Sequence, residues 1–198
     1  EEPKIKVVII LTVTDLSALP KTILSRSQIL NFLPVNSADI YDDLIKNHQA
    51  QRSQAKNFSR LSAGRPALAL KFLEEEEYYK NYEQAVQSFI SLLSPDINSR
   101  FSAIESILGK DASGHEAVKL ALGALQVWQN LARDLMLLEL DLADLIQHEV
   151  FAGELSALKG KLNLKSLVNL INILKQSREY LAANVNPRLA LENAAVSF

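Results

Sequence analysis

The sequence predicts a mainly α-helical protein that begins with one buried β-strand, and three observations support this fold class. The continuous apolar run at residues 7–11 is typical of a strand that is covered on both faces. Most later apolar residues recur at three- and four-residue steps, which indicates amphipathic helices. Glycine, proline and asparagine stand where such helices would begin or end. We therefore expect one strand followed by two helical regions.

The first expected element is the strand Val7–Leu11, which leads into the polar residues Thr12, Thr14 and Asp15. In open α/β sheets, ligands bind at the carboxyl ends of the strands. A hydroxyl group and a carboxylate at this place could therefore report on a bound phosphate. A strand of this kind needs neighbouring strands and covering helices. Because the rest of the sequence offers no second strand, we expect further α/β structure to precede this one in the natural protein.

The second expected element is a short helical turn that starts at Leu19-Pro20, because proline interrupts the extended chain and fits the first turn of a helix. This turn carries Ser25 and Arg26. A guanidinium group is planar and permanently charged, so Arg26 could bind phosphate oxygens or stabilise charge that develops during phosphoryl transfer. The alternative is that Arg26 is an ordinary exposed arginine.

The first helical region covers residues 36–80. Asn36 or Ser37 can cap its first helix, and Gly64 followed by Pro66 is the pattern expected where one helix ends and another begins. The second helical region covers residues 81–198, beginning where a new apolar period starts. Four helices are expected in this region, and they begin at Ser94-Pro95, near Gly114, at Leu164 and at Asn186-Pro187. The second of them could continue to Gln147, and the third should end near Leu181.

The composition restricts the possible functions. No cysteine is present, which excludes disulfides and thiolate metal sites. The 21 basic and 23 acidic residues nearly balance, so no overall field attracts nucleic acid or an anionic membrane. No apolar stretch approaches the roughly 20 residues of a transmembrane helix, and no signal peptide is evident. A cytoplasmic protein without membrane contact is the simplest interpretation.

Sequence motifs for metal and nucleotide chemistry are absent. His115-Glu116 and His148-Glu149 each lack the second histidine of the H-E-x-x-H zinc motif. Asp141 and Asp144 could bind a cation, but carboxylates along a helix more often form its solvated side. We therefore predict no metal site. No G-x-x-x-x-G-K-[ST] phosphate loop occurs, so this chain alone is not expected to hydrolyse ATP.

Residues 11–32 resemble the AAA+ clamp-loader subunits of bacterial DNA polymerase III. Thr14-Asp15 is similar to the family's sensor 1 site, and the stretch Leu19 to Arg26 resembles its L-P-x-T-I-x-S-R-C element. The resemblance implies that Arg26, within the Ser25-Arg26 pair, is an arginine finger placed in the ATP site of the neighbouring subunit. Ser27 replaces the family's cysteine and leaves the finger itself unchanged.

The stretch around Gly64 resembles the clamp-loader lid, whose G-S-x-R-D-x-L-S-L motif supplies the sensor 2 arginine. Aligning Gly64 and Ala69-Leu70 places Ala67 at the position of that arginine, with Arg65 two residues earlier. This departure favours the non-ATPase delta-prime type of subunit over the gamma/tau type of ATPase. Arg65 could still contact a phosphate or an interface, or it could be a surface residue at a helix start.

The stretch Asn184 to Glu192 resembles the C-terminal collar of the delta-prime type, and Trp128 with Arg133-Asp134-Leu135 matches it less specifically. The resemblance implies three domains: residues 1–35 as the end of an AAA+ α/β domain, residues 36–80 as a helical lid, and residues 81–198 as a helical collar.

The implied function is that of a non-ATPase clamp-loader subunit in DNA replication. It would bind no cofactor itself, because ATP and Mg²⁺ would occupy the neighbouring subunit. Its partners would be the gamma/tau and delta subunits and, through the complex, the sliding clamp and primed DNA. Two alternatives stay open, namely a gamma/tau-type ATPase fragment and a helical scaffold protein unrelated to replication.

Overall fold

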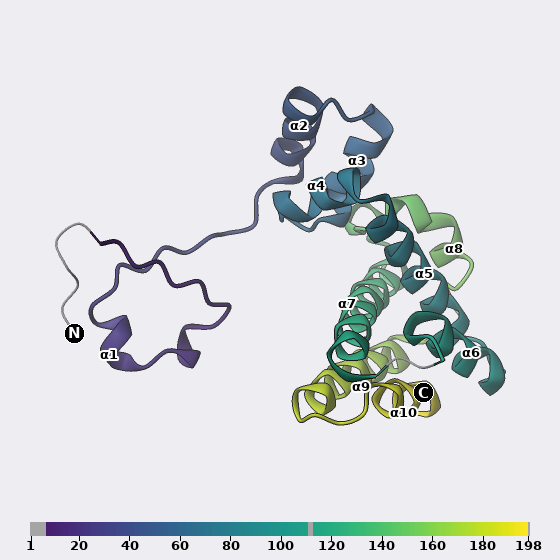
Figure 1. The fold of residues 1–198 in the computed structure, drawn as a ribbon. Helices are drawn as coiled ribbons and strands as arrows, with labels where there is room; N and C mark the ends of the chain where they lie inside the picture. Colours follow the sequence, from purple (N-terminus) through teal and green to yellow (C-terminus); the bar gives the residue numbers. More distant parts are fainter. Residues whose placement is uncertain (1–6, 111–112, 198) are drawn as a thin grey trace. The chain divides into compact units, whose positions relative to one another are not determined.

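The structure is a computed structural model, and it describes residues 7–110 and 113–197. The chain divides into two compact units between residues 33 and 34. Ten α-helices and three 3₁₀ turns form the regular structure of the described residues, and none of those residues lies in a strand (Figure 1). The prediction of a mainly α-helical chain is therefore confirmed.

The first unit contains the 3₁₀ turn η1 (Leu16–Ala18) and the one-turn helix α1 (Lys21–Leu24). It differs from the prediction at Val7–Leu11, where no strand forms and the side chains are 54–83% exposed. The physical reason is the lack of a pairing partner. A β-strand is held by backbone hydrogen bonds to a neighbouring strand, and no described residue of this chain supplies them.

The second unit begins with three helices, α2 (Ser37–His48), α3 (Arg52–Leu61) and α4 (Pro66–Glu74). The ring of Phe72 in α4 lies 5.0–5.9 Å from the rings of Tyr78, Tyr79 and Tyr82, so these tyrosines pack against the lid helices. The buried apolar residues of α2–α4 form one hydrophobic group, here called the lid cluster: Ile40, Leu44, Ala55, Phe58, Leu61, Ala69 and Phe72.

The ends of these helices follow the sequence signals. The Asn36 side chain accepts a hydrogen bond from the Ala38 amide at 3.1 Å, and Pro66 occupies the first turn of α4. Gly64 has a φ of +79°, and a Cβ at this position would lie 2.5 Å from the Cβ of Pro34. Only glycine satisfies both the left-handed backbone and this close approach. The turn between α3 and α4 is therefore specified locally.

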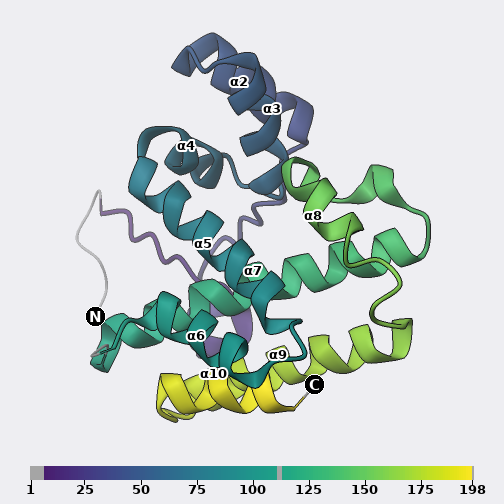
Figure 2. The ribbon, with the colours of Figure 1, turned by 90° about the vertical axis from the view of Figure 1, so that its right-hand side faces the viewer.

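The rest of the second unit is a helical bundle built around the 26-residue helix α7. Helix α7 packs against α5, α6, α9 and α10, and Figure 2 shows α2–α4 at one end of α5 with α6, α9 and α10 at the other. The elements are α5 (Glu76–Leu92), α6 (Ile97–Leu108), α7 (Gly114–Glu139), η2 (Ala143–Leu145), η3 (Glu149–Phe151), α8 (Ala152–Ser156), α9 (Leu164–Ala182) and α10 (Pro187–Val196).

The bundle encloses a larger hydrophobic group, here called the collar cluster, with Trp128 fully buried in it. The Trp128 indole Nε1 donates to the Ala85 carbonyl and to the Ser88 hydroxyl, each at 3.0 Å. These bonds fasten α7 to α5. A buried indole N–H without a partner would destabilise the fold, so the pair of acceptors makes this central position tolerable.

Two helix boundaries differ from the sequence prediction. Helix α6 begins at Ile97 rather than at the preceding proline, because the Asp96 carboxylate caps it. Helix α7 ends at Glu139 instead of continuing towards Gln147, and Asp141 takes a left-handed φ of +58° just beyond it. A residue in that conformation cannot continue a right-handed helix. The following stretch is therefore free to fold back across the bundle.

The predicted boundary between residues 80 and 81 lies inside the continuous helix α5. The two hydrophobic groups nevertheless lie on either side of it in sequence, and Tyr82 packs against both. At the other end of the bundle, Asn186 caps α10 as expected, accepting from the amides of Arg188 and Leu189. No helix among residues 7–110 and 113–197 combines the length and hydrophobicity that a bilayer crossing requires.

Candidate functional site

The segment that carries Arg26 is a closed helical turn. The Ser25 amide donates to the Lys21 carbonyl at 3.0 Å, and the Arg26 amide donates to the Ile23 carbonyl at 3.1 Å. The Ser25 hydroxyl donates to a carbonyl three residues earlier in the chain. The Ser27 hydroxyl likewise donates back into the turn, at 2.8 Å. The backbone around Arg26 is thus fixed by local bonds alone.

The Arg26 side chain is exposed. Within the part of the chain that the structure describes, its guanidinium makes no hydrogen bond and no ion pair. A guanidinium offers five N–H donors in a planar fork, which matches the geometry of carboxylate and phosphate oxygens. The first unit therefore presents an exposed guanidinium on a backbone that is closed by local hydrogen bonds.

Thr14 and Asp15 lie before this turn, and Asp15 caps η1. Its carboxylate accepts hydrogen bonds from the Ser17 amide at 2.9 Å and from the Ser17 hydroxyl. These bonds lower the pKa of Asp15, and the bond from the Ser17 hydroxyl contributes most. The carboxylate therefore stays ionised at neutral pH. Both carboxylate oxygens serve the turn in this structure. Phosphate sensing by the exposed pair Thr14-Asp15 stays a prediction.

Large apolar side chains stand exposed on both sides of the Arg26 turn. Before it, Val8 and Ile10 are each more than 80% exposed, and after it Phe32 and Leu33 are exposed by 95% and 80%. Monomeric soluble proteins rarely expose so much contiguous apolar chain unless another surface covers it. The two segments that flank the Arg26 turn therefore leave large apolar side chains uncovered among the described residues.

Arg65 belongs to the second unit, where it precedes α4. Its side-chain Nε donates to the Ser62 carbonyl at 3.0 Å, so the guanidinium helps to close the turn between α3 and α4. This bond gives Arg65 a local structural role. The structure thus gathers four of the predicted site residues, Thr14, Asp15, Ser25 and Arg26, in one short unit, and it places Arg65 in the other.

Sequence reasoning missed a buried polar chain in the second unit. Asp134 of α7 and His148 are fully buried, and the His148 ring Nδ1 lies 2.7 Å from Asp134 Oδ2. The same oxygen accepts from the backbone amides of Gln147 and His148, each at 2.9 Å. The other ring nitrogen, Nε2, lies 2.6 Å from the Tyr82 hydroxyl of α5. The three side chains link α5, α7 and the stretch between η2 and η3.

The proton positions in this chain follow from its chemistry. Asp134 Oδ2 accepts from two backbone amides, and in the tautomer whose Nδ1–H also donates to this oxygen, His148 Nε2 accepts from the Tyr82 hydroxyl. Burial, with a further contribution from the Asp134 charge, raises the pKa of Tyr82 well above its usual range. The phenol therefore keeps its proton and is a poor nucleophile. A carboxylate, an imidazole and a protonated phenol enclosed in this way favour a structural role over a catalytic one.

One signal for this network was present in the sequence. Asp134 lies three residues after Leu131 and four before Leu138, so it occupies the apolar face of α7. A carboxylate at such a position must be paired when the helix is packed. Its partners could not be named from sequence, because they come from residues that only the folded bundle brings to α7.

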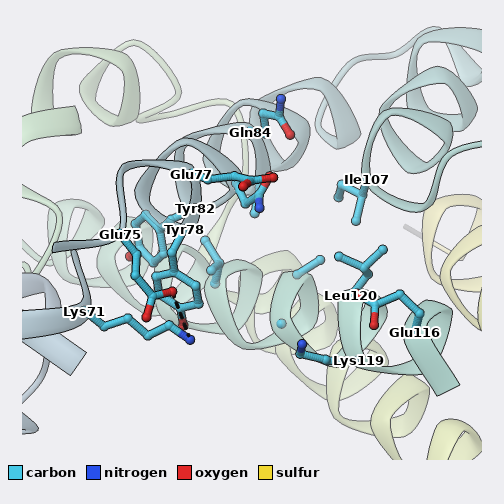
Figure 3. Close-up of a pocket in the computed structure, with 15 residues that line it drawn as sticks. Lys71, Glu75, Glu77, Tyr78, Tyr82, Gln84, Ile107, Glu116, Lys119 and Leu120 are labelled. Atoms are coloured by element: carbon cyan, nitrogen blue, oxygen red, sulfur yellow. Dashed lines mark ion pairs between the residues drawn. The ribbon is translucent and has the colours of Figure 1, made fainter. Parts of the chain in front are cut away.

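A surface pocket of about 440 Å³ lies among α4, α5, α6 and α7. Figure 3 shows Lys71, Glu75 and Tyr78 on one side of it and Glu116 and Lys119 on the other. Lys71 already pairs with Glu75 at 3.6 Å and lies 4.1 Å from the centre of the Tyr78 ring. With charges of both signs around an apolar floor, the pocket selects neither an anion nor a cation.

The comparisons with known proteins add no relative. No model of a protein family, no curated protein and no solved structure matches this chain. Among the residues that the structure describes, no group of three or more histidine, cysteine, aspartate or glutamate side chains could hold a metal ion. The exposed Arg26 turn is therefore the site with the clearest chemical capability.

Proposed function

We propose that this chain is a delta-prime-type subunit of a bacterial clamp loader, acting in DNA replication. In this proposal the helical bundle of residues 81–198 holds the subunit in the loader ring, beside the gamma/tau and delta subunits. Arg26 reaches into the ATP site of the neighbouring subunit, where ATP and Mg²⁺ are bound. The sliding clamp and primed DNA are contacted through the assembled complex.

The observation that carries the proposal is the state of Arg26. It stands exposed, without a hydrogen-bonding or ion-pair partner among the described side chains, at the end of a turn whose backbone is closed by local hydrogen bonds. An arginine finger needs this combination, because it must be held in place while its guanidinium stays available to another molecule. The match of residues 19–26 to the family's finger element supplies the identity of the ligand.

The exposed apolar segments that flank the Arg26 turn support the same proposal. In the assembled protein, the run Val7–Leu11 becomes a buried strand of an α/β domain, with Thr14-Asp15 at its carboxyl end in the sensor 1 position. The structure of the chain by itself leaves this run uncovered. A strand that pairs with an α/β body buries both its apolar side chains and its free backbone groups.

One sequence feature favours the delta-prime type over the gamma/tau-type ATPase: Ala67 stands where the lid's sensor 2 arginine belongs. Arg65 is the arginine nearest to that position, and its side chain donates to the Ser62 carbonyl, where it helps to close a turn. On this basis the chain assists ATP hydrolysis in a neighbour and performs none itself.

The test is the substitution Arg26→Ala in a clamp loader reconstituted with this subunit. Arginine fingers accelerate phosphoryl transfer by at least about 10³-fold, so the one ATP site that Arg26 serves should become nearly inactive. The total ATPase rate of the complex should fall by the fraction that this one site contributes. Size-exclusion chromatography should still show the assembled complex. Lys21→Ala removes a neighbouring exposed cation from the same turn and is the matched control.

An unchanged ATPase rate in the assembled Arg26→Ala complex would rule out the finger. Failure of the unmodified chain to join the gamma/tau and delta subunits, although it is folded by circular dichroism, would instead favour the independent scaffold protein.

A further inference from the structure

The second unit holds two hydrophobic groups that share little packing. The lid cluster draws on α2–α4, and the collar cluster draws on the helices from α5 onward. Helix α5 connects them covalently, and Tyr82 packs against both. A single helix allows the groups at its two ends to bend and twist relative to each other. Whether they move together therefore depends on what else joins them.

Residues 146–151, here called the latch segment, contact both groups. On the collar side, Ile146 and Phe151 are buried in the collar cluster. On the lid side, the Glu149 carboxylate reaches two cations of α3, with Oε1 3.0 Å from Lys56 Nζ and Oε2 2.7 Å from Arg60 Nη1. The segment lies about 90 residues from α3 in sequence, so these ion pairs are long-range contacts.

The centre of the latch segment is fixed by the buried polar chain. His148 bonds to Asp134 of α7 on one side and to Tyr82 of α5 on the other. The rings of Tyr82 and His148 are nearly parallel, with 6.0 Å between their centres. Tyr82 also meets Phe72 of the lid cluster at 5.0 Å. A continuous series of contacts thus runs from α7 through His148 and Tyr82 to the lid cluster.

We propose that residues 146–151 are a latch that holds the lid helices against the bundle, so that α2–α4 and the bundle move as one body. The lid side of the latch is polar. Ion pairs and hydrogen bonds require defined geometry, so they fix one orientation of the lid where apolar contacts alone would allow sliding. The same polar contacts can be exchanged for water, which makes the latch able to open.

The two parts of the latch differ in strength. The ion pairs of Glu149 are surface contacts, with 43% of the Glu149 side chain exposed, and such pairs contribute little each. Asp134 and His148 are fully buried and Tyr82 is partly buried, so breaking a bond in this chain leaves a buried polar group unsatisfied. We therefore assign to the polar chain the role of fixing residues 146–151 on the bundle, and to Glu149 the role of holding α3 of the lid against them.

The latch can be tested by distance measurements between spin labels. The chain contains no cysteine, so Ser53→Cys on α3 and Gln176→Cys on α9 give two specific labelling sites on exposed positions. The unmodified latch should give one narrow distance distribution. The double variant Tyr82→Phe with Glu149→Gln should give a broader distribution or a second distance. Glu154→Gln, an exposed glutamate on the neighbouring helix α8, should leave the distribution narrow.

Amide hydrogen exchange provides a second measurement. The amides of Gln147 and His148 donate to Asp134, so their exchange reports directly on opening of the latch. Loss of one hydrogen bond should speed their exchange about fivefold in Tyr82→Phe. Amides in the middle of α9 serve as the internal reference, because they lie outside the latch.

The outcomes separate clearly. A broadened distribution with unchanged helicity supports the latch. If the double variant loses helicity, the single variant Glu149→Gln is used instead, because the Glu149 side chain lies at the surface. A broadened distance distribution in this variant supports the latch. An unchanged distribution overturns it. A folded double variant whose distance distribution and exchange rates match those of the unmodified chain also overturns it. None of these results depends on the proposed clamp-loader role, which the ATPase assay tests separately.

Discussion

The two units of this chain use similar apolar residues in opposite ways. Val8 and Ile10 of the first unit are 83% and 81% exposed, whereas Leu125 and Leu131 of α7 are fully buried. In α7 the apolar positions repeat at helical spacing and meet α5 and α9 across the bundle. Residues 7–11 have no such partner within their own unit. Burial therefore depends on a matching surface as much as on hydrophobicity.

Two hydrogen-bonded carboxylates, Asp134 in the second unit and Asp15 in the first, provide the sharpest test of this difference. Asp134→Ala should destabilise the second unit by about 3–5 kcal/mol, because the substitution leaves His148 and two backbone amides without their acceptor. Urea unfolding followed by the fluorescence of Trp128, the single tryptophan, measures this loss. The matched change in the first unit is Asp15→Ala, which should leave the same transition unchanged, because the Asp15 carboxylate is exposed. Equal effects of the two substitutions would show that the units unfold together.

The same comparison can be made with one apolar residue type. Ile104 of α6 is fully buried, and Ile104→Ala should cost about 2–5 kcal/mol, since it removes apolar contacts and leaves a cavity. Ile10→Ala in the exposed segment before the Arg26 turn should change the stability of the chain by about 0.5 kcal/mol or less. Under the proposed function, Ile10→Ala should instead weaken association with the other clamp-loader subunits. A large loss of stability from Ile10→Ala in the isolated chain would contradict its exposed position.

The smallest expected effect concerns pH. The hydrogen bond from Lys56, assisted by the charges of Arg60 and Lys56, lowers the pKa of Glu149 below its ordinary value of 4.5. A lowered carboxyl pKa contributes stability that is present above the unfolded-state pKa and is lost as pH falls through the folded-state value. Glu149→Gln should therefore flatten the fall in urea midpoint between about pH 5 and about pH 3.

The pKa of Asp15 is also lowered, through its bonds to Ser17, but these bonds lie within the first unit. Asp15→Asn should leave the pH dependence of the Trp128 transition unchanged. The Glu149 contribution should shrink in high salt, because its ion pairs are exposed. A pH profile that responds equally to both substitutions would refute the assignment of Glu149 to the latch.

Much of the helical half could be predicted from the sequence, because its signals are local. Asn36 and Asn186 cap helices as expected, and Gly64 and Pro66 mark the end of one helix and the start of the next. Such signals act through hydrogen bonds and backbone angles within a few residues. The end of α7 was harder to predict, because aspartate is not a residue whose type alone indicates the left-handed backbone that Asp141 adopts.

The candidate site divides in the same way. The turn around Arg26 was predictable, because Pro20 and the following hydrogen bonds act over a few residues. The strand before it was not, because a strand forms only when another segment pairs with it. Its apolar run predicted burial, whereas residues 7–11 are exposed, because no described part of the chain covers or pairs with them.

The sequence by itself determined the helical character of the chain, most of its helix ends and the position of an arginine on a short turn. The tertiary structure alone decided that Asp134, His148 and Tyr82 meet, and that Glu149 reaches Lys56 and Arg60. The physical reason is the range of the interactions. Caps and turns join near neighbours, whereas these polar contacts join residues 14 to 93 positions apart and exist only after the helices have packed.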